Sequence, residues 1–446
     1  MTRHLLPIMA LLLGSGFLFF AGGVNSLLLP VRGGQEGFST FSLGLLGTGW
    51  AVGFVTGCLV VSKLVARVGH IRSYSVMAAL ACLAVLTSLL LLTPYAWVPL
   101  RALSGFCFAG AAMIVESWLN EKVGKESRGK VFGVYQMVNL TASTAGQMVL
   151  TLGDTRGYLF FVIAAMVYAM ALIPTAVSSS RAPQPLVSTG LNIKELWVNS
   201  PVAVFSVLLL GISNSSFGTL GAVYGTQIGL PISILALFVA LPVLAGAVIQ
   251  IPIGALSDRI DRRVVLIGMA FVGLLADALF IFAGARDAWV QISFALLFGM
   301  AIFTMFPIAI AHANDHAPPE GYVRTSGGLL LLFGIGSIIG PLLAGFAMQE
   351  AGPEGLFMVT LVTHALIAGY AVYRISQRAP VAAEEKTHFV ATPTARNTTT
   401  QTAALAADAQ GMPPMAQGAE AQADREAQTE REETSKSEPE EPGTGS

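Results

Sequence analysis

The chain has 446 residues, of which 54% are hydrophobic and 11% are charged, and its mean hydropathy is +0.68. Soluble domains carry about 25% charged residues, so this composition excludes an ordinary soluble domain and indicates a membrane protein. The formal net charge of −1 combines two unlike parts. Residues 1–378 hold 20 Lys and Arg against 14 Asp and Glu, whereas residues 379–446 hold 5 against 12.

Twelve hydrophobic runs follow one another, each near the ~20 residues that a helix needs to cross a bilayer. The first continues past Gly23 to Leu29, which favours an uncleaved helix over a signal peptide. The polar stretch 178–200 divides the runs into six and six. The predicted spans are 5–29, 40–62, 73–93, 96–118, 131–152 and 157–177, then 201–222, 233–256, 264–284, 289–311, 325–348 and 355–374.

The two sets of spans repeat one pattern. A charged loop at 252–263 has a degenerate copy at 62–72, and Trp97 and Trp289 begin spans four and ten, 192 residues apart. Parallel repeats of six helices are a known transporter plan. The sequence therefore predicts an all-α polytopic membrane protein. It has two pseudo-symmetric six-helix bundles, residues 1–177 and 201–378, joined by a cytoplasmic central linker at 178–200.

Basic residues predict the orientation, because short cytoplasmic loops are enriched in Lys and Arg. The twelve spans place sixteen Lys and Arg on the side of the N-terminus and three on the other, namely Arg32, Arg156 and Arg286. We expect a multi-pass protein of the inner (plasma) membrane with both termini in the cytoplasm.

The final segment, 379–446, is acidic and rich in Ala, Gln, Glu, Thr and Pro, and Phe389 is its only aromatic residue. Such a composition buries too little apolar surface to offset the entropy of ordering, so a disordered cytoplasmic tail is predicted. A short helix near 400–410 or 417–432 and a partner-binding role for the tail remain alternatives.

The loop at 252–263 resembles the signature of the major facilitator superfamily, Gly-x-x-x-Asp-Arg-x-Gly-Arg-Arg/Lys, which lies between spans two and three and again between eight and nine. The matching residues are Gly254, Asp258, Arg259, Arg262 and Arg263. Asp261 replaces the signature glycine. In the first-half copy, Arg67, Gly69 and a shifted Arg72 remain, but Ala66 stands where aspartate is expected.

Span four supports the same resemblance. Arg101 followed by Gly105 and Gly110 is similar to the superfamily's fourth helix, and the segments 115–119 and 128–129 resemble the YcaD-type permeases. The resemblance covers residues 1–378. It implies the superfamily's fold and a secondary transporter that works by alternating access.

Two sets of residues are candidates for the transport machinery. Arg101 is an intramembrane arginine, which costs at least ~2.5 kcal/mol unless it faces protein or water. It is interpreted as a cavity residue for anionic substrate or proton movement, with outward snorkelling as the alternative. The predicted substrate or proton pathway is Asn25, Arg101, Gln136, Asn139, Gln147 and Asn214, and the predicted gating charges are Arg67, Arg72, Glu116, Asp258, Arg259, Arg262 and Arg263.

The resemblance implies partners for two of the charges. Glu116 is expected to pair with Arg67 or Arg72, and Asp258 to lie against the start of span five. The residues Gln136, Asn139, Ser143 and Gln147 form a polar stripe on span five, which can face a cavity or pack against another helix. Asp277 is a weaker proton-site candidate, because the resemblance makes the ninth helix peripheral.

The sequence favours a secondary active transporter of a small solute, with proton-coupled efflux as a further hypothesis. The alternatives are an uptake permease or facilitator, and a non-transporting membrane sensor or scaffold that uses the acidic tail. No Walker motif, nucleophile–base pair or metal-ligand pattern is evident, so we expect neither an enzyme nor a bound cofactor or metal. The expected partners are the bilayer, the solute and protons, not nucleic acid, and the expected state is a monomer.

Overall fold

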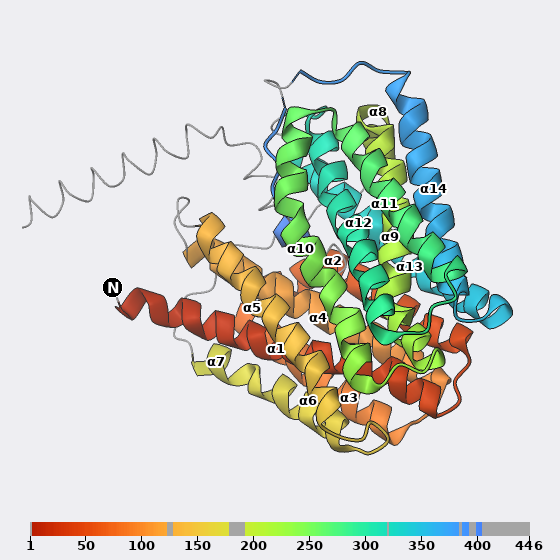
Figure 1. Ribbon diagram of the computed structural model, residues 1–446. Helices are drawn as coiled ribbons and strands as arrows, with labels where there is room; N and C mark the ends of the chain where they lie inside the picture. The colour runs from red at the N-terminus through yellow and green to blue at the C-terminus, as the bar shows by residue number, and fades with distance from the viewer. Residues whose placement is uncertain are drawn as a thin grey trace, which may run out of the picture.

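The computed structural model describes residues 2–122, 128–177, 192–318, 321–382, 386–391 and 398–403. Within them the chain is helical, without a β-strand, and the helices form two groups that diverge from a common corner (Figure 1). The first group comprises α1 (Thr2–Gln35), α2 (Thr40–Val68), α3 (His70–Leu90), α4 (Pro94–Lys122), α5 (Arg128–Val149), η1 (Leu150–Leu152), α6 (Leu159–Met170) and α7 (Leu172–Val177). The second comprises α8 (Ile193–Asn199), α9 (Pro201–Gln227), α10 (Ile232–Arg259), α11 (Arg262–Phe282), α12 (Ala288–Asn314), α13 (Tyr322–Ala351) and α14 (Gly355–Ile375).

The two halves use the same helix pairings. In the first half α2 packs on α4, α1 on α5, α3 on α4, and α6 on both α1 and α3. In the second half α10 packs on α12, α9 on α13, α11 on α12, and α14 on both α9 and α11. Replacing α1–α6 by α9–α14 converts one set of pairings into the other, which confirms the predicted pseudo-symmetric bundles.

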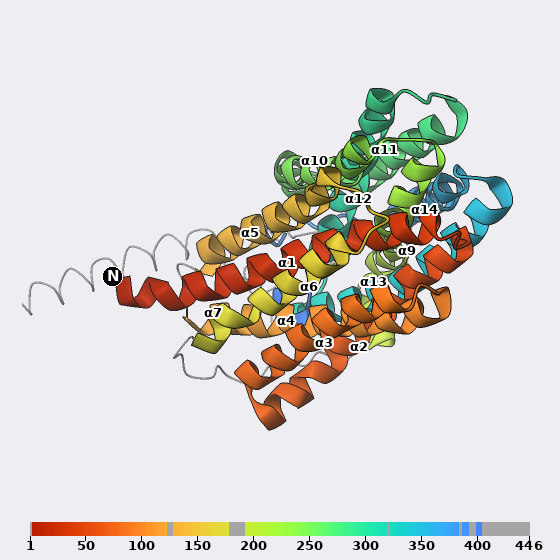
Figure 2. The same ribbon diagram turned by 90° about the horizontal axis from the view of Figure 1, so that it is seen from below.

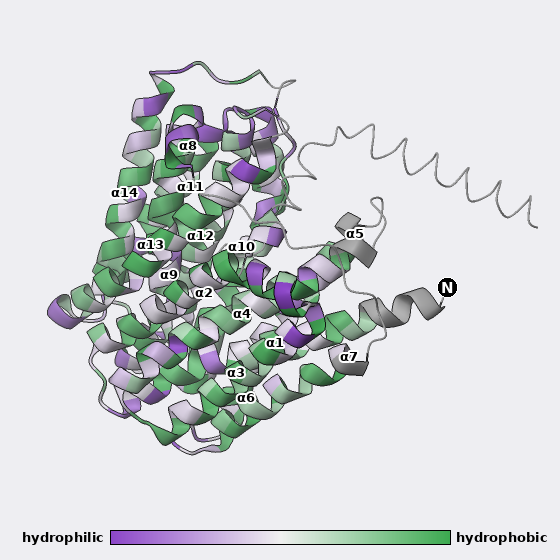
Figure 3. Cartoon of the chain, turned by 180° about the vertical axis from the view of Figure 1, so that it is seen from behind, coloured by the Kyte–Doolittle hydropathy of each residue, from purple (hydrophilic) through white to green (hydrophobic). Residues whose placement is uncertain are grey.

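Ten of the described helices are long and apolar enough to cross a membrane. They are α1–α4 and α9–α14, so the predicted spans five and six differ from the rest. Span five is α5, whose polar stripe lowers its hydropathy. Span six breaks into α6 and α7 at Ala171, because Pro174 has no N–H to bond the carbonyl of Met170. Hydrophobic residues predominate along the helices, and hydrophilic residues gather around α8 (Figure 3).

Glycines allow the paired helices to touch through their backbones. A Cβ on Gly146 in α5 would lie 2.1 Å from the carbonyl oxygen of Phe20 in α1. In the second half, a Cβ on Gly340 in α13 would lie 2.3 Å from the carbonyl oxygen of Ile212 in α9. The two glycines thus occupy equivalent crossings, and small residues at helix interfaces are what membrane bundles require.

The bundle has two ends. We call the end with the α2–α3 and α10–α11 turns the tail end, because the C-terminal segment lies there, and the opposite end, with the α1–α2 and α9–α10 turns, the far end. Gly69 joins α2 to α3 with φ +86° and ψ 165°. This is a backbone conformation that residues with a Cβ rarely adopt, so the sequence needs glycine at this turn.

Replacing Gly69 with alanine is expected to destabilise the protein by about 1–3 kcal/mol, because alanine must adopt the same backbone conformation with a Cβ. Gly268→Ala is the matched control. Gly268 lies in α11 with open space around it, so alanine there should be neutral or stabilising by roughly 0.5–1 kcal/mol. Thermal unfolding midpoints of both variants in detergent test this, and equal midpoints would contradict the assignment.

Part of the predicted disordered tail is packed. Residues 398–403 are buried and 386–391 lie against the tail end, with a single helical turn beginning at Thr400. The prediction of a solvated tail is wrong for these two segments, because their burial depends on threonine hydrogen bonds and one aromatic ring rather than on an apolar pattern. Residues 404–446, including the alternative helix at 417–432, lie outside the described residues.

Candidate functional site

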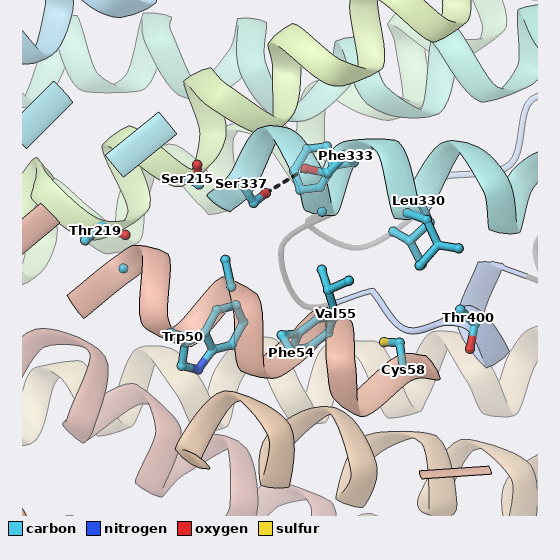
Figure 4. A pocket seen from close by; sticks show the side chains of 14 residues that line it. Trp50, Phe54, Val55, Cys58, Ser215, Thr219, Leu330, Phe333, Ser337 and Thr400 are labelled. Carbon is cyan, nitrogen blue, oxygen red and sulfur yellow. Dashed lines mark hydrogen bonds between the residues drawn. The ribbon is translucent and has the colours of Figure 1, made fainter. Parts of the chain in front are cut away.

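A cavity lies between the two halves (Figure 4). Its empty volume is about 480 Å³, including open space at its mouth. One wall is a face of α2, with Trp50, Phe54 and Cys58 at four-residue intervals; the opposite wall comes from α9 and α13. The hydroxyl-bearing residues of the wall are Ser215, Thr219, Ser337 and Thr400. The cavity is therefore mainly apolar and aromatic, with a few hydroxyl groups and no charged wall residue.

The far end of the cavity is closed by backbone contact between α2 and α13. A Cβ on Gly44 would lie 2.2 Å from the carbonyl oxygen of Pro341, and the Thr48 hydroxyl donates to the carbonyl oxygen of Ile338 at 2.8 Å. The symmetry-related pair, α5 and α10, makes a looser contact, and the two helices lie beside each other in Figure 2. The two halves are held together at the far end by the α2–α13 contact, and the two helix groups diverge toward the tail end (Figure 1).

The structure places the predicted pathway residue Asn214 outside this cavity. Its Nδ2 donates to the carbonyl oxygens of Leu210 and Ile302, at 3.0 and 3.3 Å, so the side chain faces α12. The next residue on α9, Ser215, lines the cavity instead. Asn214 and Ser215 are neighbours on one helix, and a single sequence does not show which of the two faces the cavity.

The pathway candidates of the first half are buried or half-buried, and they do not line the cavity. Four of them have a buried polar atom without a hydrogen-bond partner: Asn25 Oδ1, Arg101 Nε, Asn139 Nδ2 and Gln147 Oε1. Arg101 lies near Tyr168 of α6. An unsatisfied buried polar group costs roughly 1–3 kcal/mol, so these atoms are candidates for contact with water or a polar ligand.

The polar stripe of α5 faces α1 over part of its length. Ser15 donates to Asn139 Oδ1 at 2.7 Å, and a Cβ on Gly23 would lie 2.2 Å from the carbonyl oxygen of Ser143. Helix packing is therefore the role of the stripe at this depth. For the half-buried Gln136 and Gln147, a role in the pathway stays a prediction.

The gating charges of the second half form a compact network at the tail end. Arg262, 1% exposed, donates from Nε to Asp315 Oδ2 at 2.6 Å and from Nη1 to Asp258 Oδ1 at 2.9 Å. The Arg262 guanidinium also donates to the Ser257 hydroxyl and to the carbonyl oxygen of Thr387. Asp258 thus pairs with Arg262 in this conformation, and its expected contact with the start of span five, which the structure describes only in part, stays a prediction.

The neighbouring charges stabilise the α10–α11 turn. The Asp261 carboxylate caps α11 by accepting from the Arg263 backbone N–H, and it pairs with the Arg263 guanidinium at 2.7 Å. Burial alone would raise the pKa of Asp261, but the bonds from Arg263 hold it below its ordinary value. Arg263 also donates to the carbonyl oxygens of Arg374 and Arg378, which ties the turn to the end of α14. Arg259 is exposed.

The first-half charges are arranged differently from the prediction. Glu116 is 1% exposed and accepts hydrogen bonds from the hydroxyls of Tyr135, at 3.1 Å, and Thr399. Arg67 and Arg72 are exposed, and the structure shows no bond from either to Glu116. The predicted pairing is wrong here because hydroxyl groups solvate the buried carboxylate, while the arginines remain in water.

Sequence reasoning undervalued one buried polar cluster. Asp277 in α11 and His364 in α14, each fully buried, are joined by a 2.7 Å contact between Oδ2 and Nδ1. His364 Nε2 lies 3.1 Å from the Ser213 hydroxyl of α9, and the Thr360 hydroxyl donates to Asp277 Oδ1 at 2.6 Å. His364 was missed because a lone histidine in an apolar run carries no pattern. The four-residue spacing on α2 was the available signal for Trp50, Phe54 and Cys58.

Two similar helix bundles around a shared cavity, with ten helices apolar enough to span a bilayer, define a polytopic membrane protein of the transporter class. The family profile of the Major Facilitator Superfamily matches residues 11–331 and, separately, 203–407. The chain belongs to this superfamily, and its function is membrane transport.

Relatives support the same assignment. An uncharacterized MFS-type transporter of Yersinia pestis (strain Pestoides F) is 26% identical over 372 residues, which cover 80% of this chain and 93% of the relative. The uncharacterized MFS-type transporter YcaD of Escherichia coli O45:K1 is 26% identical over 373 residues, with the same coverage. The predicted similarity to YcaD-type permeases is thereby confirmed.

Two solved structures share the fold. The nucleoside transporter NupG superposes with a TM-score of 0.69 at 13% identity, covering 83% of this chain and 98% of NupG. A bacterial homolog of the human lysosomal transporter Spinster, in an inward-facing and unoccupied conformation, has a TM-score of 0.64 at 13% identity and covers 92% of this chain and 99% of that one.

Proposed function

We propose that the protein is a secondary active transporter that moves a small solute by alternating access around the cavity between its halves. The observation that carries the proposal is the closure of this cavity at the far end, where Gly44 and Pro341 bring α2 and α13 into backbone contact. Rocking of two repeats about a fixed site is the usual mechanism for this architecture. The far-end contact is then the one that must open for solute to cross.

The cavity wall favours an uncharged or weakly polar solute with an aromatic or apolar part. Trp50, Phe54 and Phe333 offer ring faces and edges, and Ser215 and Ser337 offer hydroxyl groups for orientation. An anionic solute is less well supported, because Arg101 is not in the wall. NupG is a nucleoside transporter, and nucleosides, which fit this chemistry, belong in any test panel.

Proton coupling is supported by the Asp277–His364 pair. Ionisable residues buried within membrane helices are costly and usually functional. When the His364 imidazole is neutral, its Nδ1–H donates to Asp277 and its Nε2 accepts from the Ser213 hydroxyl. When His364 is an imidazolium, both ring nitrogens donate, and only the Ser213 hydroxyl must rotate. The cluster thus accommodates an added proton without movement of heavy atoms.

The basic residues near the tail end favour a cytoplasmic tail end and cytoplasmic termini. With that orientation, the cavity receives solute from the cytoplasm, which is consistent with proton-coupled efflux.

A cross-link across the far end tests alternating access. In a variant with its three cysteines replaced by serine, Thr48→Cys and Ile338→Cys are oxidised in proteoliposomes containing a pH-sensitive dye. Solute-dependent proton movement is first found with a panel of nucleosides, neutral aromatic compounds, organic cations and organic anions. We expect oxidation of this pair to stop that movement and a reductant to restore it.

The matched control pair is Arg286→Cys with Glu354→Cys within the second half, where the ends of two long side chains meet at 2.8 Å, so these cysteines are joined by a reducible bis-methanethiosulfonate linker. Its cross-link should leave proton movement intact, because it does not join the halves. Undiminished movement after the far-end cross-link would refute alternating access. No movement with any solute of the panel would instead support the sensor or scaffold alternative.

A further inference from the structure

The C-terminal segment enters the space between the two halves. After α14 ends at Ile375, residues 386–391 lie across the α10–α11 turn of the second half. Residues 398–403 then lie beside α2 and α4 of the first half, where Thr400 borders the cavity next to Cys58 (Figure 4). The segment therefore touches both halves at the tail end, where the halves diverge.

The first part of the segment is anchored on the signature loop. Thr387 donates from its backbone N–H and its hydroxyl to Asp315 Oδ1, at 2.9 and 2.8 Å. The backbone N–H of Phe389 donates to Asp258 Oδ1 at 3.1 Å. Two carboxylates of the second-half network thus accept from the tail in addition to Arg262.

Gly254, the first glycine of the signature, makes room for the Phe389 ring. A Cβ on Gly254 would lie 2.1 Å from Phe389 Cδ1, so the ring occupies the place that a side chain would take. Lys386 adds a third anchor, since its Nζ donates to the carbonyl oxygen of Ile260 at 2.6 Å, at the C-terminus of α10. The only aromatic side chain of the tail therefore lies at the one position in the loop that lacks a side chain.

The second part of the segment is buried against the first half. Its six residues, Thr398 to Ala403, carry no charge and are each between 0% and 6% exposed, although the tail as a whole is strongly acidic. Thr399 donates its hydroxyl to Glu116, the buried carboxylate of α4. Hydroxyl donors at this point compensate a charge that has no basic partner among the described residues, which an acidic or apolar segment would not do.

We propose that residues 386–391 and 398–403 form a built-in plug, an intramolecular ligand that occupies the tail-end mouth of the cavity and bridges the two halves. The plug binds the second half through Asp258, Asp315 and Gly254, and the first half through Glu116. Solute entry from the tail end and closure of that end both require it to leave.

Cys58 is a native reporter of this plug, because it lines the cavity beside Thr400 and is 6% exposed. In a Cys82→Ser, Cys107→Ser background in nanodiscs, we compare the rate of Cys58 labelling by a charged, water-soluble maleimide. Removing residues 383–446 is expected to raise the rate on the order of tenfold or more, as for a protected site that becomes open. Removing only 404–446 keeps both plug segments and should leave the rate at that of the full chain.

Point variants of the full chain give the same test without truncation. Phe389→Ala and Thr399→Val should each accelerate labelling, because they remove the ring beside Gly254 and the hydroxyl on Glu116. His388→Ala is the matched control, since His388 is exposed, and it should have no effect. Size-exclusion profiles verify folding, and the point variants decide the matter if the truncated chain does not fold.

The proposal is overturned if Cys58 labels at one rate in the full chain, the 383–446 deletion and both point variants. It is also overturned if the 404–446 deletion alone gives the fast rate. Because the assay needs no solute, its result is independent of whether transport by alternating access is demonstrated.

Discussion

Replacing Arg262 with leucine is expected to lower the free energy of unfolding by about 3–5 kcal/mol. The guanidinium is 1% exposed and makes two bonds to Asp315, whose side chain is 2% exposed. Leucine leaves the Asp315 carboxylate buried without its cation, and the Thr387 hydrogen bonds alone compensate it poorly. Denaturant titration in mixed micelles, followed by tryptophan fluorescence, measures the change in the free energy of unfolding.

The double variant Arg262→Leu, Asp315→Leu tests whether the loss of stability comes from the Asp315 carboxylate that the single variant leaves unpaired. Because removing both partners leaves no unpaired charge between these two positions, it should recover much of the loss of the single variant. Arg259→Leu is the matched control within the same signature, and it should change stability by less than about 0.5 kcal/mol, since Arg259 is exposed. Equal losses in Arg262→Leu and Arg259→Leu would contradict the role of the network.

The spans and their repeat could be predicted because they depend on long-range composition. A helix that crosses a bilayer needs a sustained apolar run, and the registration of Gly146 with Gly340 places equivalent helix crossings in both halves. Pro174 was the available signal for the break between α6 and α7. The break was not predicted, because the apolar run around Pro174 fits a single continuous span. Composition therefore identifies where helices lie better than where they stop.

The partners of the charged residues could not be predicted from one sequence. Arg262 pairs with Asp315, 53 residues away, and donates a further hydrogen bond to the carbonyl oxygen of Thr387, 125 residues away. Glu116 was assigned to Arg67 or Arg72 because the family resemblance implies that pairing, whereas its partners are the hydroxyls of Tyr135 and Thr399. These contacts form because elements distant in the sequence pack together, and no local sequence pattern predicts that packing.

The packing of part of the tail could not be predicted from the sequence either. Its composition indicates disorder, since bulky apolar residues are rare and acidic residues frequent. The buried part is an uncharged run of threonines that satisfies the hydrogen-bonding demand of Glu116, and Phe389 fills the space over Gly254. Burial here depends on complementarity to an existing cavity rather than on hydrophobicity.

Replacing Asp277 with asparagine is expected to abolish pH-gradient-driven flux of a solute found in the proton-movement screen, while exchange of labelled for unlabelled solute continues. Asparagine has the shape of aspartate and can still accept from the Thr360 hydroxyl, but it cannot gain or lose the proton that the Asp277–His364 pair holds. Solute binding in the cavity does not use this carboxylate, so exchange needs only the rocking of the halves.

Glu354→Gln is the matched control for Asp277→Asn. Glu354 forms a surface ion pair with Arg286 at the far end, and its loss removes a carboxylate outside the membrane core. It should leave both gradient-driven flux and exchange unchanged. His364→Gln should reproduce the effect of Asp277→Asn, because the imidazole is the second member of the proton site. Full gradient-driven flux in Asp277→Asn would remove this pair from the coupling mechanism and leave the proton role to other buried ionisable groups, of which Arg101 is the one predicted from the sequence.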